Sequence, residues 1–249
     1  MTARSTPAAT CRPAGPASPE ADGATTMTEG PGHPIPLVRK LAAEFFGTFC
    51  LVLVGTGAIV VNDVSGGGVT PVGIALCFGF VVLAMILALG DVSGSHINPA
   101  VTCGLCAAGW FPAGQVIPYV VSQCAGAIAA SSVLRLLFQQ HATLGATLPS
   151  GSETQAFCFE LLLTAILMFT ILNVSARPLV RLITVATAVA AVIAMSALWA
   201  GPVCGASLNP ARSLAPALLT GTYTSLWLYI VAPVCGALVG VGAWRAVRG

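Results

Sequence analysis

The sequence predicts an all-α membrane protein with six transmembrane helices and two re-entrant half-helices that form an inverted repeat. Three observations predict this fold class: an apolar, charge-poor composition, six apolar runs of membrane-spanning length, and a tripeptide that occurs once in each half. Hydrophobic residues make up 56% of the chain and charged residues only 7%, whereas a soluble domain carries about 25% charged residues. The net charge of +2 also gives no indication of a nucleic-acid partner.

The composition changes sharply near residue 36. Residues 1–36 are rich in Pro, Ala, Thr and Gly and contain few large apolar side chains, so they cannot bury enough surface to offset chain entropy. We therefore expect 1–36 to be a disordered N-terminal tail, without the apolar core of a secretory signal. Residues 37–249 then form the membrane domain, with one repeat over about 37–138 and the other over about 153–246.

Apolar runs follow one another from residue 37 onward. A helix needs about 20 apolar residues to cross the ~30 Å hydrocarbon core of a bilayer. Two further helical stretches, near 98–108 and 209–219, are too short to cross alone. The candidate spans are 38–61, 70–90, 114–138, 155–175, 180–200 and 223–244.

Basic residues predict how the spans are oriented. Lys and Arg gather on cytoplasmic loops, and six spans place three basic clusters on the same side. These clusters are Arg39 and Lys40, Arg177 and Arg181, and Arg245 and Arg248. Both termini are therefore expected in the cytoplasm, with the chain in the cell (plasma or inner) membrane. Because each half has three spans, the halves insert in opposite orientations, as in the inverted repeats of transporters and channels.

The two short stretches each begin with the tripeptide Asn-Pro-Ala, within "SGSHINPAVT" and "CGASLNPARS". Asn is a preferred N-cap, and Pro is well placed in the first helical turn. We therefore expect two half-helices that enter from opposite faces and meet at the bilayer midplane, each presenting a partial positive charge. The residues predicted at this centre are Asn98, Pro99, Ala100, Asn209, Pro210 and Ala211.

Irregular backbone at membrane depth is tolerated where it lines a water-filled cavity. The loops before the half-helices should therefore line such a cavity and offer carbonyl acceptors, while the two Asn amides donate hydrogen bonds. The loop residues expected there are Gly94, Ser95, His96, Ile97, Cys204 and Gly205. His96 is either a titrating pore group or a loop hydrogen-bonder, and Cys204 is either a reactive thiol at the mouth or a packed small residue.

These residues suit the passage of a neutral solute along carbonyl acceptors, because two helix N-termini oppose cations and protons. Arg212 lies in the first turn of the second half-helix, where a cation opposes the helix dipole. A charge within the membrane indicates function, although Arg212 could also pair structurally with an acid or with carbonyls. The nine cysteines lie mostly in apolar runs and lack zinc-finger spacing, so we expect neither a metal nor a cofactor.

With these motifs, the chain resembles the aquaporin or major intrinsic protein family over nearly all of 37–246. The segments "GPVCGASLNPARSLAPAL", "QAFCFELLLTAILMFTILNV" and "LWLYIVAPVCGAL" are most similar to nodulin-like intrinsic proteins and their bacterial relatives. The resemblance implies a homotetramer with one pore per subunit. It also implies that Glu44 and Glu160 hold the re-entrant loops in place. Gln123 is a further residue expected to bond a re-entrant loop.

The resemblance also implies a four-residue constriction at Phe78, Ala197, Ala206 and Arg212. Water-selective members usually carry His where Ala197 stands, so two alanines predict a wider, less polar opening. We therefore expect a channel for water and small uncharged solutes, such as glycerol, urea, and boric or arsenous acid. The alternatives are a strictly water-selective pore and small-residue helix packing at both alanines.

Two other functional classes compete with a passive pore. A secondary transporter also uses inverted repeats and broken helices, but it would need intramembrane carboxylates at the site itself. Glu44 and Glu160 are the candidates, and both lie far in sequence from the Asn pair. A membrane enzyme is disfavoured because the spans contain no Ser-His-Asp set, metal cluster or paired acids.

Overall fold

A computed structural model describes residue 1 and residues 35–176 and 182–248, and these ranges contain helices and loops but no strand. The predicted tail therefore lies outside the described residues, apart from Met1, Ile35 and Pro36. The helices of the first half are α1 (Leu37–Val64), α2 (Thr70–Ser93), α3 (Pro99–Ala107) and α4 (Ala113–Leu137). Those of the second half are α5 (Glu153–Ser175), α6 (Leu182–Cys204), α7 (Pro210–Thr220) and α8 (Leu226–Arg248).

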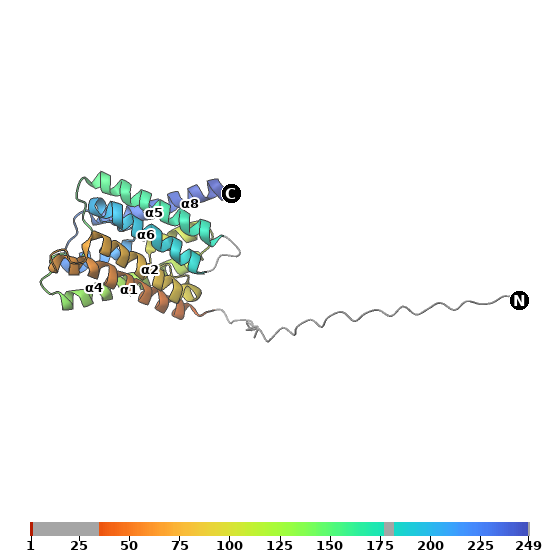
Figure 1. The fold of residues 1–249 in the computed structure, drawn as a ribbon, viewed down its shortest axis with the longest axis horizontal. Helices are drawn as coiled ribbons and strands as arrows, with labels where there is room; N and C mark the ends of the chain where they lie inside the picture. Colours follow the sequence, from red (N-terminus) through yellow and green to blue (C-terminus); the bar gives the residue numbers. More distant parts are fainter. Residues whose placement is uncertain (2–34, 177–181, 249) are drawn as a thin grey trace. The chain divides into compact units, whose positions relative to one another are not determined.

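Among the described residues, six helices are long and apolar enough to cross a membrane, which confirms the predicted spans (Figure 1). They have 23 to 28 residues and mean hydropathy values of 1.5 to 2.9. The two half-helices have 9 and 11 residues, about 14 and 16 Å at 1.5 Å per residue, so neither spans the bilayer. The predicted end of α6 near residue 200 is too early, because the helix continues to Cys204 and ends at the left-handed Gly205.

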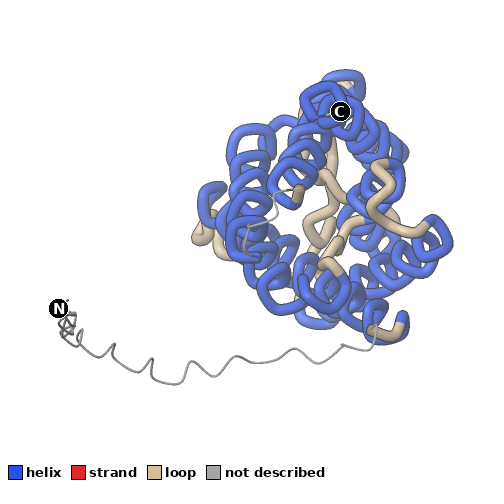
Figure 2. The backbone as a smooth tube through the Cα atoms, turned by 90° about the vertical axis from the view of Figure 1, so that its right-hand side faces the viewer, coloured by secondary structure: helices blue, strands red, loops and turns tan. Residues whose placement is uncertain are grey.

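The two halves repeat the same order of elements and the same packing. In each half the first long helix packs against the last, α1 with α4 and α5 with α8, and against the second, α1 with α2 and α5 with α6. Seen end on, the helices surround loop segments that pass through the middle of the bundle (Figure 2). The fold therefore carries its two irregular loops inside the bundle.

Glycines allow the closest of these helix contacts. A Cβ atom at Gly126 of α4 would overlap the carbonyl oxygen of Phe45 in α1, and one at Gly236 of α8 would overlap that of Leu161 in α5. Small residues at such crossings let membrane helices approach backbone to backbone. Phe45 and Leu161 directly follow Glu44 and Glu160, so the same crossing lies beside the same buried acid in each half.

Candidate functional site

The site is built where the two half-helices begin. The Oδ1 atom of Asn98 accepts a hydrogen bond from the amide N of Ala100 at 2.8 Å. The Oδ1 atom of Asn209 accepts from the amide N of Ala211 at 3.0 Å and of Arg212 at 3.4 Å. Both Asn backbones are extended, and a proline opens each helix. The two asparagines are therefore N-caps, as the sequence predicts.

The two half-helices are joined through these same side chains. Asn98 Nδ2 donates to the carbonyl of Leu208 at 2.8 Å, and Asn209 Nδ2 donates to the carbonyl of Ile97 at 2.8 Å. Each amide has two N–H groups, so one hydrogen on each remains for another acceptor. The N-termini of α3 and α7 thus meet through reciprocal hydrogen bonds between opposite halves of the chain.

Both asparagines line one cavity of about 250 Å³ inside the bundle. The expected loop residues Gly94, Ser95, His96 and Ile97 also line it. Its apolar wall comes mainly from α2, α5 and α6. Residues of the wall that the sequence did not single out include Leu51, Val82, Ile86, Val101, Leu105, Trp110, Leu167, Ile171, Val185, Val189 and Ile193. Uniformly apolar helices carry no periodic signal of which face is turned inward, so these residues could not be selected in advance.

Glu44 fixes the first re-entrant loop from α1. Its carboxylate accepts from Ser93 Oγ at 2.7 Å, His96 N at 2.9 Å, Ile97 N at 2.7 Å and Gln123 Nε2 at 2.7 Å. The side chain is fully buried, and a buried carboxylate requires such partners to offset its desolvation. Gln123 therefore bonds the supporting glutamate, and also Thr102 Oγ1 at 3.0 Å, instead of the loop backbone.

Glu160 of α5 has the same role toward the second loop. Its carboxylate accepts from Ser207 N at 2.7 Å and from Leu208 N at 2.8 Å. Ile97 and Leu208, the residues before the two asparagines, have positive φ values of 44° and 54°. Non-glycine residues in this region cost about 1–3 kcal/mol each, and the carboxylate bonds to their amides offset that strain.

The four residues of the predicted constriction, Phe78, Ala197, Ala206 and Arg212, all line the same cavity. Arg212 is 2% exposed, and its Cζ atom lies 5.4 Å from the centre of the Phe78 ring. Its Nη1 donates to the carbonyl of Gly145 at 2.8 Å, and its Nε has no partner among the described residues. Arg212 therefore both pairs with a carbonyl and lies in the cavity wall, although the sequence alone left structural pairing and a functional place as alternatives.

The segment between α4 and α5 takes part in this site, which the sequence did not indicate. Besides Gly145, this segment supplies Thr147, whose Oγ1 donates to Ser213 Oγ at 2.8 Å. Ser213 Oγ in turn bonds Ser207 Oγ, which donates to the carbonyl of Asn209 at 3.0 Å. A chain of hydroxyls thus connects the segment to the start of α7. Thr147 lies far in sequence from Ser207 and Ser213, and only the fold brings it to them.

Several predicted residues lie near the cavity without lining it. The other residues of the two tripeptides are buried in the first turns of the half-helices and do not line the cavity. They are Pro99, Ala100, Pro210 and Ala211. Cys204 and Gly205, which were also expected along the pore, are not among the residues that line this cavity. The Cys204 thiol is fully buried and lies 3.4 Å from both the Ala200 carbonyl and the Ala206 amide. It is therefore a packed residue at the end of α6 and does not present a thiol at the mouth.

His96 lines the cavity and also makes a hydrogen bond to the first half-helix. Its Nδ1 lies 3.2 Å from Thr102 Oγ1, whose own hydrogen is directed at the carbonyl of Asn98 at 3.1 Å. Nδ1 is therefore the donor of this pair, and the lone pair lies on Nε2. Its ring also packs against Phe111 and Tyr119, with ring centres at 4.7 and 5.2 Å.

Six apolar spans and two half-helices that meet inside them define an integral membrane protein built around an internal cavity. Residues 33–244 match the sequence profile of the major intrinsic protein family. The chain therefore belongs to the major intrinsic protein family, as the motifs predict.

Relatives and a solved structure agree with this assignment. Aquaporin NIP1-1 of Zea mays is 43% identical over 215 residues, which cover 86% of this chain and 76% of that protein. Nodulin-26 of Glycine max is 40% identical over 215 residues, covering 86% of this chain and 79% of that protein. The X-ray structure of the aquaglyceroporin from Plasmodium falciparum is 28% identical and superposes with a TM-score of 0.78, covering 85% of this chain and 97% of that one.

Proposed function

We propose that this protein is a passive transmembrane channel for water and small uncharged solutes such as glycerol. One observation carries the proposal: a single cavity is lined by both capping asparagines and by the four-residue set around Arg212. A solute in this cavity meets one spare N–H on each asparagine at the centre and apolar helix walls elsewhere. Passage needs no covalent change, so the proposal assigns the chain no enzymatic reaction.

The same geometry opposes ions and protons. Each half-helix directs an N-terminus equivalent to about half a positive charge at the centre, and the guanidinium of Arg212 adds a full charge at the constriction. A cation entering the cavity is repelled at both places. At the centre a solute can only accept hydrogen bonds from the two Asn amides, which interrupts proton transfer along a file of water.

The constriction favours solutes larger than water. Phe78 provides an apolar wall and Arg212 a donor, while Ala197 and Ala206 contribute only methyl groups to the same cavity. This combination suits a polyol or an undissociated acid, with one apolar edge and several hydroxyl groups. Glycerol, urea, boric acid and arsenous acid are the candidates. A strictly water-selective pore is the alternative.

The hydrogen bonds of the two buried glutamates disfavour a coupled transporter. Both carboxylate oxygens of Glu44 and of Glu160 accept hydrogen bonds from loop amides. Neither carboxylate can bind a coupling ion without releasing a re-entrant loop.

We further infer that the chain assembles as a homotetramer in the cell membrane, with one pore per subunit and both termini in the cytoplasm. The basic residues Arg39, Lys40, Arg245 and Arg248 at the two ends of the membrane domain support this orientation. Native mass spectrometry of the detergent-solubilised protein tests the assembly, and a mass of one or two chains would exclude the tetramer.

Reconstituted vesicles test the proposed function. We expect stopped-flow light scattering to show faster equilibration of water, glycerol and urea in protein-containing vesicles than in protein-free ones, with sorbitol excluded. Boric and arsenous acid extend the same panel. Equal rates with and without protein would exclude the channel, whereas glycerol uptake driven by a proton gradient would indicate a coupled transporter.

Substituting Ala197→His tests the selectivity. A bulky imidazole in place of a methyl group narrows the opening, so glycerol flux is expected to fall about tenfold or more while water flux falls less than threefold, a difference of about 1 kcal/mol in barrier height. A larger loss of water flux than of glycerol flux would place the constriction elsewhere.

A further inference from the structure

Trp110 lies at the end of the cavity opposite to Arg212. It stands three residues before the start of α4, whereas Gly145, the carbonyl partner of Arg212, follows the end of the same helix. The 25 residues of α4 extend over about 37 Å at 1.5 Å per residue. Because Trp110 and Arg212 both line the cavity, the cavity connects the two ends of the bundle.

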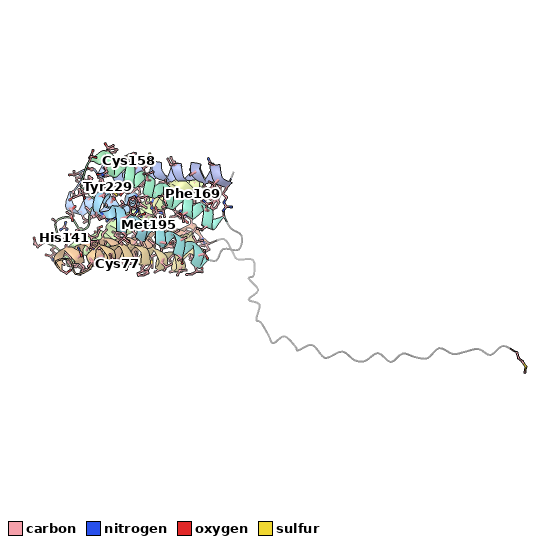
Figure 3. All side chains as sticks on the ribbon, turned by 45° about the horizontal axis from the view of Figure 1, so that its top comes forward. Cys77, His141, Cys158, Phe169, Met195 and Tyr229 are labelled. Carbon is pink, nitrogen blue, oxygen red and sulfur yellow. The ribbon has the colours of Figure 1, made fainter. Side chains whose placement is uncertain are left out.

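Contacts of α8 place Trp110 at the same end independently. Figure 3 shows His141, which follows α4, at one end of the bundle and Phe169 of α5 toward the other. Gly240 of α8 packs against Phe169, since a Cβ atom built on this glycine would lie 3.1 Å from the Phe169 amide N. One helical turn further along α8, the ring of Trp244 meets the ring of Trp110, with 5.4 Å between their centroids. Trp110 therefore lies at the Phe169 end of the bundle.

The backbone fixes the place from which the Trp110 side chain starts. The amide N of Trp110 donates to the carbonyl of Leu105 at 2.9 Å, and that of Gly109 donates to the carbonyl of Cys106 at 3.0 Å. Gly109 has a φ of 82°. These two bonds around a left-handed glycine form a Schellman motif, which ends the first half-helix, α3, in a defined geometry.

The last turns of α8 hold the indole itself. The Trp244 ring stands edge-on to the Trp110 ring, at an interplanar angle of 84°, which is a preferred arrangement of two aromatic side chains. Trp244 is in turn packed against the buried cluster that contains Met168. The next residue, Arg245, donates from Nη2 to the carbonyl of Ala107 at 2.7 Å. The end of α8 therefore supports both the end of α3 and the ring that follows it.

The two ends of the cavity differ in the size of their side chains. Trp110 has the bulkiest side chain among the described residues that line the cavity. It is also 41% exposed, so it stands where the cavity meets the surface. At the Arg212 end, Ala197 and Ala206 contribute only methyl groups. A solute that has passed the two alanines must still pass the indole.

We propose that Trp110 is a specificity-determining residue that sets the upper size of the solutes the channel passes, with Trp244 as its positioning residue. The inference rests on the proposed channel function. The indole is held at its backbone and at its edge, so it cannot turn aside as a long flexible side chain would. Linear polyols of three carbons pass the ring, and polyols of four or five carbons are retarded by it. The upper size limit of the pore therefore lies at the Trp110 end of the cavity.

Stopped-flow entry of glycerol, erythritol and ribitol into reconstituted vesicles tests the proposal. In the wild type, erythritol flux is expected to be a small fraction of glycerol flux. Trp110→Ala removes the ring, so the ratio of erythritol to glycerol flux is expected to rise several-fold while water flux stays close to that of the wild type. Trp110→Phe keeps a smaller ring, and we expect an intermediate ratio. An unchanged ratio in Trp110→Ala would overturn the proposal.

Trp227 provides the matched control. It lies at the start of α8, is 53% exposed and packs against the ring of Phe157 with 5.8 Å between centroids, but it does not line the cavity. Tryptophans also anchor helices at membrane surfaces, and in that role Trp110 and Trp227 would behave alike. We expect Trp227→Ala to keep the wild-type ratio of erythritol to glycerol flux. An equal rise in Trp110→Ala and Trp227→Ala would assign the effect to lost anchoring and overturn the proposal.

The role of Trp244 is tested through Trp110. Trp244→Ala removes the edge contact, so the flux ratio is expected to rise, but less than in Trp110→Ala. Trp244→Phe retains an aromatic edge and should restore the wild-type ratio. When Trp244→Ala is combined with Trp110→Ala, we expect no further rise, because Trp244 acts through the ring that is already absent. A further rise in the double variant would contradict the positioning role.

The same panel of solutes separates this inference from the proposed function. If glycerol permeates the wild type and Trp110→Ala leaves the ratio of erythritol to glycerol flux unchanged, the channel stands and the size-limiting role of Trp110 fails. If neither water nor glycerol permeates the wild type or any variant, the proposed function fails, and the inference fails with it.

Discussion

The two re-entrant loops have the same backbone geometry, but different side chains hold that geometry in place. In both, a buried glutamate accepts the amide before the Asn cap, at Ile97 in the first loop and Leu208 in the second. Both caps reach across to the opposite loop with the same 2.8 Å bond. The two halves thus preserve the geometry that brings the N-termini of the two half-helices together.

The side chains around this shared backbone are different. In the first half, Gln123 of α4 bonds both Glu44 and Thr102, and Tyr119 donates its hydroxyl to the carbonyl of Ser93 at 3.0 Å. In the second half, Pro233 stands three residues before Gly236, as Gln123 stands three before Gly126, and it offers no amide. The Tyr229 hydroxyl has no partner among the described residues.

The second loop obtains its remaining support from outside the repeat. Thr147 and Gly145, in the segment between α4 and α5, bond Ser213 and Arg212 of α7. The side-chain hydrogen bonds described for the first loop thus come from the transmembrane helices α1 and α4, whereas the second loop also depends on a connecting segment outside the helices. Arg212 belongs to the second loop, so its position depends on a contact with this connecting segment.

The largest expected effect tests what the halves share. Ala at Gly126 or Gly236 places a Cβ atom against a backbone carbonyl of the neighbouring helix. Neither helix can approach as before, so both variants should lose most of the folded protein, to a similar extent. Fluorescence-detected size-exclusion chromatography measures this loss.

Gly114→Ala is the control, because nothing lies within 4 Å of its Cβ position, and it should behave as the wild type does. A wild-type profile for Gly236→Ala alone would show that the two crossings are not equivalent.

A smaller loss of stability is expected from substituting the two supporting glutamates, which accept different numbers of hydrogen bonds. The Glu44 carboxylate accepts four hydrogen bonds, and the Glu160 carboxylate accepts two. In Glu44→Gln and in Glu160→Gln, a neutral amide group with its own N–H donors replaces the carboxylate and faces the same donors. Hydrogen bonds to charged groups contribute about 1.5–3 kcal/mol each. We expect the free energy of unfolding to fall by about 3 kcal/mol for Glu44→Gln and about 2 kcal/mol for Glu160→Gln.

Thermal unfolding in detergent, followed by loss of monodisperse protein, ranks the two glutamate variants. If Glu160→Gln proves the less stable, the second loop relies on its glutamate more than the bond counts indicate.

The smallest effect separates stability from selectivity. Thr102→Ala removes an acceptor of His96 and Gln123 and should lower stability by about 1 kcal/mol, with the ratio of glycerol to water flux unchanged. Ser213→Ala breaks the hydroxyl chain to Thr147 and should change that ratio about twofold, since it loosens the loop that carries Arg212. The vesicle assay measures the ratio of glycerol to water flux for both variants. If this ratio is the same in Thr102→Ala and Ser213→Ala, the two loops do not differ in their effect on selectivity.

The sequence by itself determined the membrane class, the six spans, both half-helix starts and the capping role of Asn98 and Asn209. These features depend on local chemistry: apolar run length sets the spans, and an Asn-Pro pair suits a helix start in almost any surroundings. The resemblance to the family also implied the set Phe78, Ala197, Ala206 and Arg212, and all four line one cavity in the structure.

The tertiary structure alone decided which residues face the cavity and what holds the second loop. Cys204 illustrates the first point, because Ala206 and Ser207 shortly after it line the cavity while its own side chain is fully buried in the packing at the end of α6. Gly145 and Thr147 illustrate the second. Their contacts join residues 67 and 66 positions apart, and no local pattern encodes such pairs, because their geometry arises only when the helices pack.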